Sequence, residues 1–376
     1  MTTERVYMDY NATTPIRPVA REAVLAALDT LGNPSSVHRE GRTARAIVED
    51  AREKIAALVH CMPSDVVFTS GATEANNWVL SASWQTIFLP EIEHDSNLAP
   101  ARRSPARVIE LPAVQTGQAD VTEVANVVLS GQSVGSAVLV LQAANNETGV
   151  VQPVAEAADF CREHDIAVHC DAVQAAGRID LGFSQLGVDT LSLSSHKIGG
   201  PMGVGALIVR DADRAKPMIV GGGQERRQRA GTENVSGIAG FGAAAEAALR
   251  DLAQVGRLEA LRTRLEQQIQ ATTPQAVIVG ADAKRLANTS CVALPGTSAE
   301  ILLIKLDLAG ISVSSGAACS SGKVGASHVL SAMGLAPEVA RGAIRISLGW
   351  NTSERDVDAV LSAWRDVVGD RQKAVA

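Results

Sequence analysis

The feature that most constrains the fold is the regular alternation of short apolar segments with segments of helical spacing. Residues 66–69 have the pattern of a short buried strand, and helical spacing follows over 73–84. Further strand-like segments lie at 86–89, 137–141, 166–169, 190–193 and 205–209, with a clear helical pattern at 154–164. This alternation is typical of α/β proteins, in which helices cover both faces of a mainly parallel sheet.

Composition supports this architecture. Hydrophobic residues make up 46% of the 376 residues, but aromatic residues make up only 3%. A large core must therefore be built mainly from Ala, Val, Leu and Ile, which suit strands that are buried on both faces. The fold class predicted from the pattern is α/β.

The pattern changes in the last third of the chain. An alanine-rich helical stretch at 238–252 is followed by a long helical stretch at 256–270. Beyond it come strand-like segments at 291–294 and 343–348 and helical segments at 298–309 and 353–368. We therefore predict a large domain over residues 15–255 and a smaller α+β domain formed by residues 1–14 and 256–376.

Charge and cysteine usage exclude several classes of protein. The formal net charge of -7 argues against general binding to nucleic acid or anionic membranes, although Arg226, Arg227 and Arg229 form a local basic patch. Neither a secretory signal nor an apolar run of about 18 residues is visible. The five cysteines include no CxxC pair, which argues against a disulfide framework or a structural zinc site. We expect a cytoplasmic protein with no metal, membrane or nucleic-acid partner.

Polar residues follow five of the predicted strands at the point where each strand ends. In chain order they are Ser70–Thr73 as a Ser-Gly-Ala-Thr segment, His94, the pair Asn145 and Asn146, Asp171 with Gln174, and a Ser-Ser-His-Lys segment ending at Lys197. Ligands of open α/β sheets bind at the carboxyl ends of the strands. We therefore expect these five groups to converge on one crevice.

Two of these groups have alternative interpretations. The Ser-Gly-Ala-Thr segment opens a helix and suits an anion, but Ser and Thr are also common helix N-caps. Asp171 ends an apolar strand, where a carboxylate is costly unless it is paired. A protonated ring nitrogen of a cofactor is one suitable partner, and an N-cap or a structural salt bridge is the alternative.

Lys197 is the strongest single candidate for covalent chemistry. It lies between an apolar strand and a Gly-Gly-Pro turn, which is a poor position for a solvated surface charge. A lysine that forms a Schiff base needs such a partly desolvated position so that its amine can be neutral. Ser194 and His196 lie beside it in sequence and can donate hydrogen bonds to a phosphate.

Cys319 and Arg345 are candidates in the C-terminal part. Cys319 lies in a loop of small residues at about 314–325, where a thiolate could be exposed, whereas the other four cysteines have the surroundings of core residues. A loop cysteine without function is the alternative. Arg345 lies in an alternating strand and is taken, from the pattern alone, as an ordinary exposed strand arginine. Its functional interpretation is a bidentate clamp for a carboxylate.

With these residues in view, the chain resembles the cysteine desulfurases among the fold-type I pyridoxal-phosphate enzymes, in the class-V aminotransferase-like family. The matching segments run through the chain in order: YMDYNATTP at 7–15, GNPSS at 32–36, FTSGATE at 68–74, NNETG at 145–149, DAVQ at 171–174, SSHKIGGP at 194–201, GTEN at 231–234, SSGAACSS at 314–321 and IRISL at 344–348. The last loop resembles the group with a long catalytic loop.

The resemblance implies a role for each residue around pyridoxal 5'-phosphate. Lys197 would carry the cofactor, and His94 would stack on its ring and move protons. Asp171 would pair with the ring nitrogen, with Gln174 and Asn146 on the phenolate side.

The phosphate contacts follow from the same resemblance. Ala72, Thr73, Ser194 and His196 would hold the phosphate. Thr232 would reach the phosphate of the partner subunit, which implies a homodimer with shared active sites.

Substrate and product follow in the same way. Arg345, with Asn11 nearby, would bind the carboxylate of L-cysteine. Cys319 would attack the substrate sulfur, leaving L-alanine and a persulfide for a sulfur acceptor, with iron–sulfur cluster assembly as the expected destination. Another fold-type I enzyme, such as an aminotransferase or a selenocysteine lyase, would leave the Cys319 loop unexplained. An inactive relative would be expected to lack Lys197 or Asp171, and both are present.

Overall fold

The computed structural model describes residues 5–211, 216–316 and 327–375. In this part of the chain, seven strands form the larger sheet, in the order β2-β8-β7-β6-β5-β3-β4. Their bounds are β2 Val66–Thr69, β3 Thr86–Pro90, β4 Arg107–Leu111, β5 Ala137–Gln142, β6 Ala167–Asp171, β7 Thr190–Ser194 and β8 Gly205–Val209. Strand β8 runs in the opposite direction to the other six strands, so the carboxyl ends of those six meet at one edge of the sheet.

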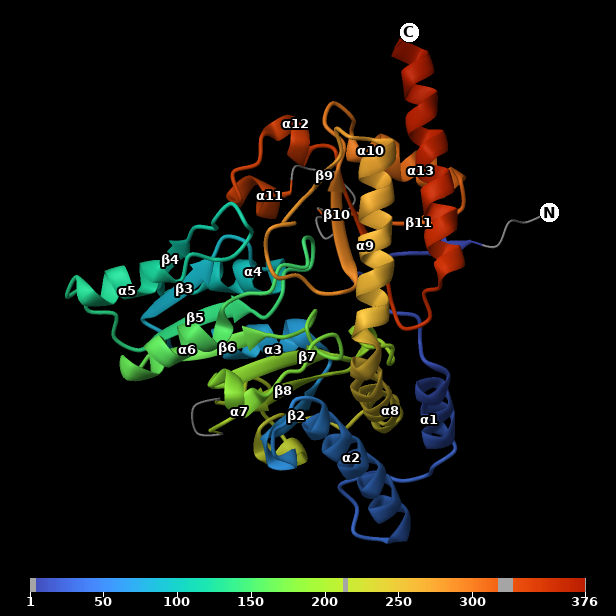
Figure 1. Ribbon diagram of the computed structural model, residues 1–376. Coiled ribbons are helices and arrows are strands. Elements are labelled where there is room, and N and C mark those ends of the chain that lie inside the picture. The colour runs from blue at the N-terminus through green and yellow to red at the C-terminus, as the bar shows by residue number, and fades with distance from the viewer. Residues whose placement is uncertain (1–4, 212–215, 317–326, 376) are drawn as a thin grey trace.

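Helices cover both faces of this sheet (Figure 1). Successive side chains of a strand point to opposite faces. Val138 and Val140 of β5 accordingly pack with residues of α3 (Ala72–Leu80) and α4 (Asp95–Arg103), whereas Leu139 and Leu141 belong to the main core. That core also receives α2 (Arg39–Leu58), α6 (Val154–Glu163) and α8 (Val235–Asp251), and α1 (Pro18–Leu28) packs on α8.

A smaller antiparallel sheet lies in the C-terminal part and has the order β12-β13-β10-β9 among the described residues. These strands are β9 Val277–Ile278, β10 Thr289–Ala293, β12 Ser314–Ser315 and β13 Ala343–Ser347, and α9 (Val255–Thr272), α10 (Ala299–Leu308) and α13 (Glu354–Val375) accompany them (Figure 1). A short parallel pair joins β1 (Val6–Tyr7) to β11 (Ile311–Ser312). A second hydrophobic core forms here, and Trp364 is one of its largest buried side chains.

The two cores meet at β10. Val292 belongs to the core of the smaller sheet, but its neighbours Cys291 and Ala293 belong to the main core. The remaining helices are α5 (Thr122–Leu129), α7 (Phe183–Leu186), α11 (His328–Ala332) and α12 (Pro337–Ala340). Among the described residues, no helix is long and apolar enough to cross a membrane.

The predicted fold class is confirmed: a mainly parallel sheet between helices is accompanied by a smaller α+β part. The domain boundaries at residues 15 and 255 stay a prediction. Strand β4 was missed because it is an edge strand whose residues Arg107 and Glu110 are exposed, so it lacks an apolar run. Strand β6 extends two residues further than expected and includes Asp171 itself.

Candidate active site

A cavity of about 630 Å³ opens at the carboxyl ends of the parallel strands. This volume suits a small-molecule cofactor with its substrate. Eleven of the residues that the sequence singled out line it: Asn11, Ala72, Thr73, His94, Asn146, Asp171, Gln174, Ser194, His196, Lys197 and Arg345. The predicted convergence of separate strand ends on one crevice is therefore what the structure contains.

The start of α3 forms one wall of the cavity. Gly71 is the N-cap residue, and no side chain caps the helix, so the interpretation of Ser-Gly-Ala-Thr as a plain side-chain N-cap is wrong. Ser70 instead donates its amide to Glu74 Oε2 at 2.8 Å. The amides of the first helical residues, Ala72 and Thr73, have no acceptor within the helix, which makes this turn suited to an anion.

Glycine at 205 allows β8 to approach this turn closely. A Cβ atom on Gly205 would lie 2.7 Å from the Cα atom of Gly71 and 2.6 Å from the carbonyl oxygen of Leu193. A side chain there would push the turn away from the sheet. A Cβ atom on Gly71 would meet no atom within 4 Å, so the turn faces open space.

Asp171 is buried at the floor of the cavity and is held by neutral donors. Its Oδ2 accepts a hydrogen bond from Asn76 Nδ2 at 2.8 Å, and its Oδ1 accepts one from the Val173 amide at 3.1 Å. No ion pair reaches Asp171 from the described residues, so the salt-bridge alternative is wrong. The carboxylate thus remains available to a cationic group in the cavity.

Asn76 connects Asp171 to a second buried group, His169. His169 Nε2 donates to Asn76 Oδ1 at 2.9 Å, and His169 Nδ1 lies 2.9 Å from the hydroxyl of Thr190. Burial lowers the pKa of His169 to about 4, so its ring is neutral at pH 7. With the ring proton on Nε2, as this hydrogen-bond network requires, the oxygen of Asn76 faces His169 and its amino group faces Asp171.

The same amide also reaches the catalytic candidate His94. Asn76 Nδ2 donates to Ser96 Oγ at 2.9 Å, and Ser96 Oγ lies 2.8 Å from His94 Nδ1. The Ser96 amide also donates to that nitrogen at 3.1 Å. Two donors on Nδ1 leave the proton of the neutral ring on Nε2. Asn76 and His169 were missed by the sequence reasoning because an asparagine inside a helix and a histidine inside a strand carry no local motif.

Glu93 is a further buried acid next to this network. Burial first, and the charge of Asp171 second, raise the pKa of Glu93 to about 8. Its oxygens accept hydrogen bonds from the Gln142 amide at 2.7 Å and from Asn97 Nδ2 at 2.9 Å. The residue immediately before His94 is therefore largely protonated at neutral pH.

Lys197 follows β7 in a short 3-10 turn (Ser195–Lys197) and reaches the N-terminal segment. Its Nζ donates to the carbonyl oxygens of Asn11 at 2.6 Å and Ala12 at 3.0 Å. Gln174 also binds this segment, through Nε2 to the Asn11 carbonyl at 3.1 Å. Residues near the start of the chain thus form a wall of the cavity.

His196 contributes a neutral donor. Burial first, and then the charges of Lys197 and Arg178, lower the pKa of His196 to about 4. Its Nδ1 lies 3.1 Å from the hydroxyl of Thr13. A neutral imidazole can donate one hydrogen bond to an anion without bringing a charge.

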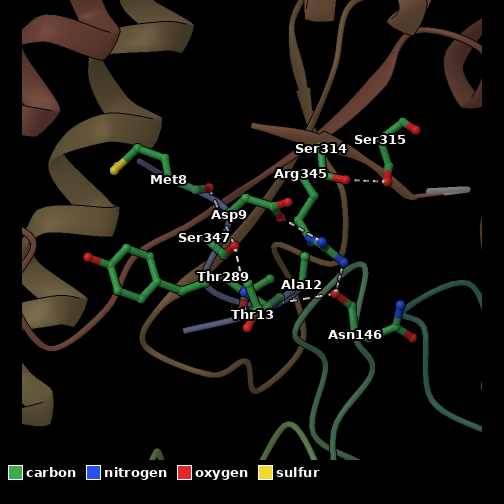
Figure 2. Close-up of polar contacts among 12 residues, drawn as sticks. Met8, Asp9, Ala12, Thr13, Asn146, Thr289, Ser314, Ser315, Arg345 and Ser347 are labelled. Atoms are coloured by element: carbon green, nitrogen blue, oxygen red, sulfur yellow. Dashed lines mark hydrogen bonds and ion pairs between the residues drawn. The ribbon is translucent and has the colours of Figure 1, made fainter. Parts of the chain in front are cut away.

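Arg345 of β13 is buried, with 3% of its surface exposed, so its interpretation as an ordinary exposed strand arginine is wrong. Figure 2 shows its guanidinium in contact with Asp9 and Asn146. Its Nη2 donates to Asp9 Oδ1 at 2.7 Å and its Nη1 to the carbonyl oxygen of Asn146 at 3.0 Å. Its buried Nε has no hydrogen-bond partner among the described residues, so one donor of the guanidinium is left unused by them. The partner Asp9 was not assigned a role from the sequence, although it lies in the segment 7–15.

Asn11 is engaged by the protein itself. Its Nδ2 donates to the Asn146 carbonyl at 3.1 Å and to Thr289 Oγ1 at 3.0 Å, while its Oδ1 accepts from Asn288 Nδ2 at 3.0 Å. Asn11 therefore holds the segment that also binds Arg345. Direct contact of its side chain with a substrate stays a prediction.

Two predicted site residues, Thr232 and Cys319, are not yet placed. Thr232 is exposed on the surface. Cys319 lies outside the described residues, but the strand that leads to it does not: Ser314 of β12 pairs with Arg345 of β13. Strand β12, which precedes Cys319 in the sequence, therefore lies next to the strand that carries Arg345.

The other four cysteines are poor nucleophiles. Burial raises the pKa of Cys61, Cys161 and Cys291 to about 12, and it raises that of Cys170 well above the ordinary thiol value. The thiolate is the reactive form of cysteine, and the raised pKa keeps these four thiols in the protonated form at neutral pH.

Comparison with known proteins identifies the family. The model of the aminotransferase class-V family matches residues 6–360. The chain is 37% identical over 375 residues to the cysteine desulfurase IscS of Dictyoglomus turgidum, covering 96% of this chain and 94% of that one. It is 40% identical over 385 residues to a cysteine desulfurase of Cereibacter sphaeroides, covering 99% and 98%. A solved NifS-like protein from Rickettsia africae superposes with a TM-score of 0.91 at 35% identity, covering 97% of this chain and 100% of that one.

The chain therefore belongs to the class-V aminotransferase family, whose cysteine desulfurase members are pyridoxal-phosphate-dependent enzymes. Within this family it belongs to the cysteine desulfurases, to which it is similar over nearly their whole length.

The donors in the cavity fit this cofactor. The turn at Ala72 and Thr73 offers amides to a phosphate, and it faces open space at Gly71. Asp171 offers a carboxylate without a cationic partner among the described residues, which suits a ring nitrogen that carries a proton. Lys197 offers the primary amine that binds the aldehyde. The chemistry that bound pyridoxal phosphate supplies is an electron sink for the bonds at the amino-acid α-carbon.

Proposed function

We propose that the protein converts L-cysteine to L-alanine and leaves the sulfur as a persulfide on Cys319. The observation that carries the proposal is the convergence of Lys197, Asp171 and Arg345 on one cavity. The cavity thereby combines the amine of Lys197 for the cofactor, the carboxylate of Asp171 for the cofactor ring and the guanidinium of Arg345 for an amino-acid carboxylate. A solved structural neighbour at 31% identity, SspA, is described in complex with cysteine, which supports the choice of substrate.

Arg345 binds and orients the substrate in this proposal. Asp9 and the Asn146 carbonyl hold two of its nitrogens, so the guanidinium is fixed before a substrate arrives. A fixed guanidinium is suited to a carboxylate, because the two groups match in planar geometry. The adjoining strand β12 would deliver Cys319 to the same end of the substrate.

Lys197 and His94 move protons. Ser96 occupies Nδ1 of His94, which directs the exchangeable proton to Nε2. Lys197 and His94 both line the cavity, so each can exchange a proton with a substrate bound there.

Cys319 completes the reaction by accepting sulfur. Its thiolate attacks the sulfur of the bound cysteine, the electron pair of the carbon–sulfur bond stays with carbon, and that carbon then takes up a proton. The net change is L-cysteine plus the Cys319 thiol giving L-alanine plus the Cys319 persulfide. The high pKa values of the other four thiols support Cys319 as the acceptor.

We further propose a homodimer in which Thr232 reaches the phosphate of the partner. Two features support it. Thr232 is exposed and does not line its own cavity. Large apolar side chains are also exposed at Leu31, Val37, Met202 and Val220, with 69% or more of their surface accessible. Contact with a second copy of the chain would remove this apolar surface from water, which favours association.

The persulfide is passed on to an acceptor protein, for which we propose a component of iron–sulfur cluster assembly. A reducing cytoplasm is the compartment that keeps Cys319 as a free thiol.

The test separates the two halves of the reaction. Cys319→Ser should bind the cofactor and change its absorbance when cysteine is added, but it should form little alanine and carry no persulfide. Lys197→Ala should fail earlier, because it lacks the amine that binds the aldehyde of the cofactor. Treatment with borohydride should accordingly fix no cofactor to the chain. Mass spectrometry of alkylated protein after one turnover locates the sulfur. Sulfur on Cys61, Cys161, Cys170 or Cys291, or full activity of Cys319→Ser, contradicts the proposal.

Mixing two variant chains tests whether the active sites are shared between subunits. A Lys197→Ala chain and a Thr232→Val chain are each expected to be impaired. Heterodimers of the two contain one site free of both changes, so mixing should raise activity above either parent. A fully active monomer in sedimentation experiments contradicts the dimer.

A further inference from the structure

A carboxylate lies in the wall of the cavity next to the predicted phosphate turn. Glu74 is in the first turn of α3 and lines the cavity. Its Oε2 accepts the Ser70 amide at 2.8 Å, so it braces the loop between β2 and α3. A negative charge at this place opposes the binding of an anion, even though the bracing itself helps to shape the turn.

Arg229 compensates this charge. Its Nε donates to Glu74 Oε1 at 2.9 Å and its Nη2 to Glu74 Oε2 at 3.1 Å, which is a bidentate pair. Burial would raise the pKa of Glu74, but the hydrogen bonds from Arg229 and Ser70 hold the pKa below its usual value. Both groups are therefore charged at neutral pH. The sequence suggested a local basic patch formed by Arg226, Arg227 and Arg229. Arg229 is not free to take part in such a patch, because its charge is paired with Glu74.

The segment that carries Arg229 is itself held firmly. Glu225 forms a buried bidentate ion pair with Arg52 at 2.8 and 2.9 Å and accepts the Phe68 amide of β2 at 2.9 Å. Residues 225–227 have positive φ values of 43°, 56° and 69°, a strained conformation that persists only where contacts enforce it. Arg229 is consequently delivered to Glu74 by a segment anchored on β2.

We propose that Arg229 is a positioning residue for cofactor binding: it neutralises Glu74, so that Glu74 can brace the turn at Ser70–Thr73 without repelling the phosphate of the cofactor. This inference rests on the proposed function, because it takes that turn as the phosphate site. The ion pair between Arg229 and Glu74 would then control the affinity for the phosphate group without either side chain contacting the cofactor.

The experiment compares a ligand that has the phosphate with one that lacks it. Full-length protein freed of cofactor is titrated with pyridoxal 5'-phosphate and with pyridoxal, and the ratio of the two Kd values is the readout. Arg229→Gln should weaken binding of pyridoxal phosphate on the order of 10-fold, as expected for one uncompensated charge near an anion, and leave binding of pyridoxal within about twofold. Glu74→Gln/Arg229→Gln should restore most of the ratio, and Arg229→Lys should keep most of it.

Arg226→Gln is the matched control, since it removes the same charge from the same segment at an exposed position. It should leave the ratio unchanged. Equal weakening of both ligands by Arg229→Gln, without rescue by the double variant, would mean a structural role only and overturns the proposal. If Arg229→Gln does not fold, Glu74→Gln decides: an equal or larger preference for the phosphorylated ligand supports the proposal, and a smaller preference overturns it.

Failure of the proposed function looks different. In that case the unmodified protein binds neither ligand, or binds both equally, before any variant is made. A wild-type preference for the phosphorylated ligand that survives in Arg229→Gln refutes this inference alone.

Discussion

Replacing Asn76 with aspartate tests whether its amide holds the charge of Asp171 in place. The amide nitrogen lies 2.8 Å from Asp171 Oδ2. An aspartate at this position brings a second carboxylate against the first, with the two charges about 4 Å apart. At an effective dielectric constant of about 20 their repulsion is about 4 kcal/mol, which corresponds to roughly three pKa units. The pKa of one carboxyl of the pair should therefore be raised well above the usual range of a carboxyl group.

The sign of the pH effect follows from this shift. At acid pH the pair keeps one proton, and the introduced side chain, when protonated, can donate to Asp171 as the amide does now. As the pH rises through the raised pKa, the proton is lost and the repulsion appears. Asn76→Asp should therefore bind cofactor and form alanine at about the wild-type rate at pH 6, and lose on the order of 10-fold in both by pH 9. Its stability in urea should fall over the same interval.

Cofactor absorbance titrations and alanine assays over this pH range measure the effect. Asn76→Leu is the matched control, because it removes the hydrogen bonds without adding a charge. It should impair the enzyme equally at all pH values. A variant Asn76→Asp with the wild-type pH profile would refute the argument that this amide protects the charge of Asp171.

Three further predictions concern other buried groups. Arg52→Met leaves Glu225 as an uncompensated buried carboxylate and should lower the free energy of unfolding, measured in urea titrations, by about 3–5 kcal/mol. The double variant Arg52→Met/Glu225→Leu should recover part of this loss. An unchanged free energy of unfolding would contradict the anchoring of residues 225–227. Because the pKa of Glu93 is raised to about 8 in the folded protein, its contribution to the free energy of unfolding is present below the pKa of the unfolded state and is lost as the pH rises through about 8. In urea titrations, the free energy of unfolding of Glu93→Gln should not show this decrease with pH. Asp9→Asn removes the charged partner of Arg345 and should raise KM for cysteine more than it lowers kcat in alanine assays, whereas an unchanged KM would show that Asp9 does not orient the guanidinium.

The sequence predicted the site residues well where a polar side chain comes shortly after the end of a strand. His94, Asp171 and Lys197 each come shortly after an apolar run, and parallel strands bring such positions together whatever the details of packing. The alternating pattern around Arg345 was misleading because period-two spacing indicates one covered face only. The side chain of Arg345 is covered by contacts with Asp9 and with the carbonyl group of Asn146, which sequence spacing does not reveal.

The supporting residues could not be predicted for a related reason. Asn76 and His169 acquire their roles through hydrogen bonds between elements that are far apart in sequence, and each side chain taken alone is ordinary in its element. The same holds for Glu74, which is a common kind of acidic residue in a first helical turn until Arg229 is placed beside it. Long-range partners of this kind need the structure.

The segment at Val6–Thr14 is synthesised early but can take its place only late. Val6 pairs with Ile311 in a parallel ladder, and the carbonyl groups of Asn11 and Ala12 bind Lys197. Most of the chain must therefore leave the ribosome before this segment finds its strand partner. Contacts of such long range form slowly and leave the waiting segment exposed. Completion of the cavity wall is thus expected to be a late event in the maturation of each new chain, after the larger sheet has formed and close to the moment at which cofactor can be retained.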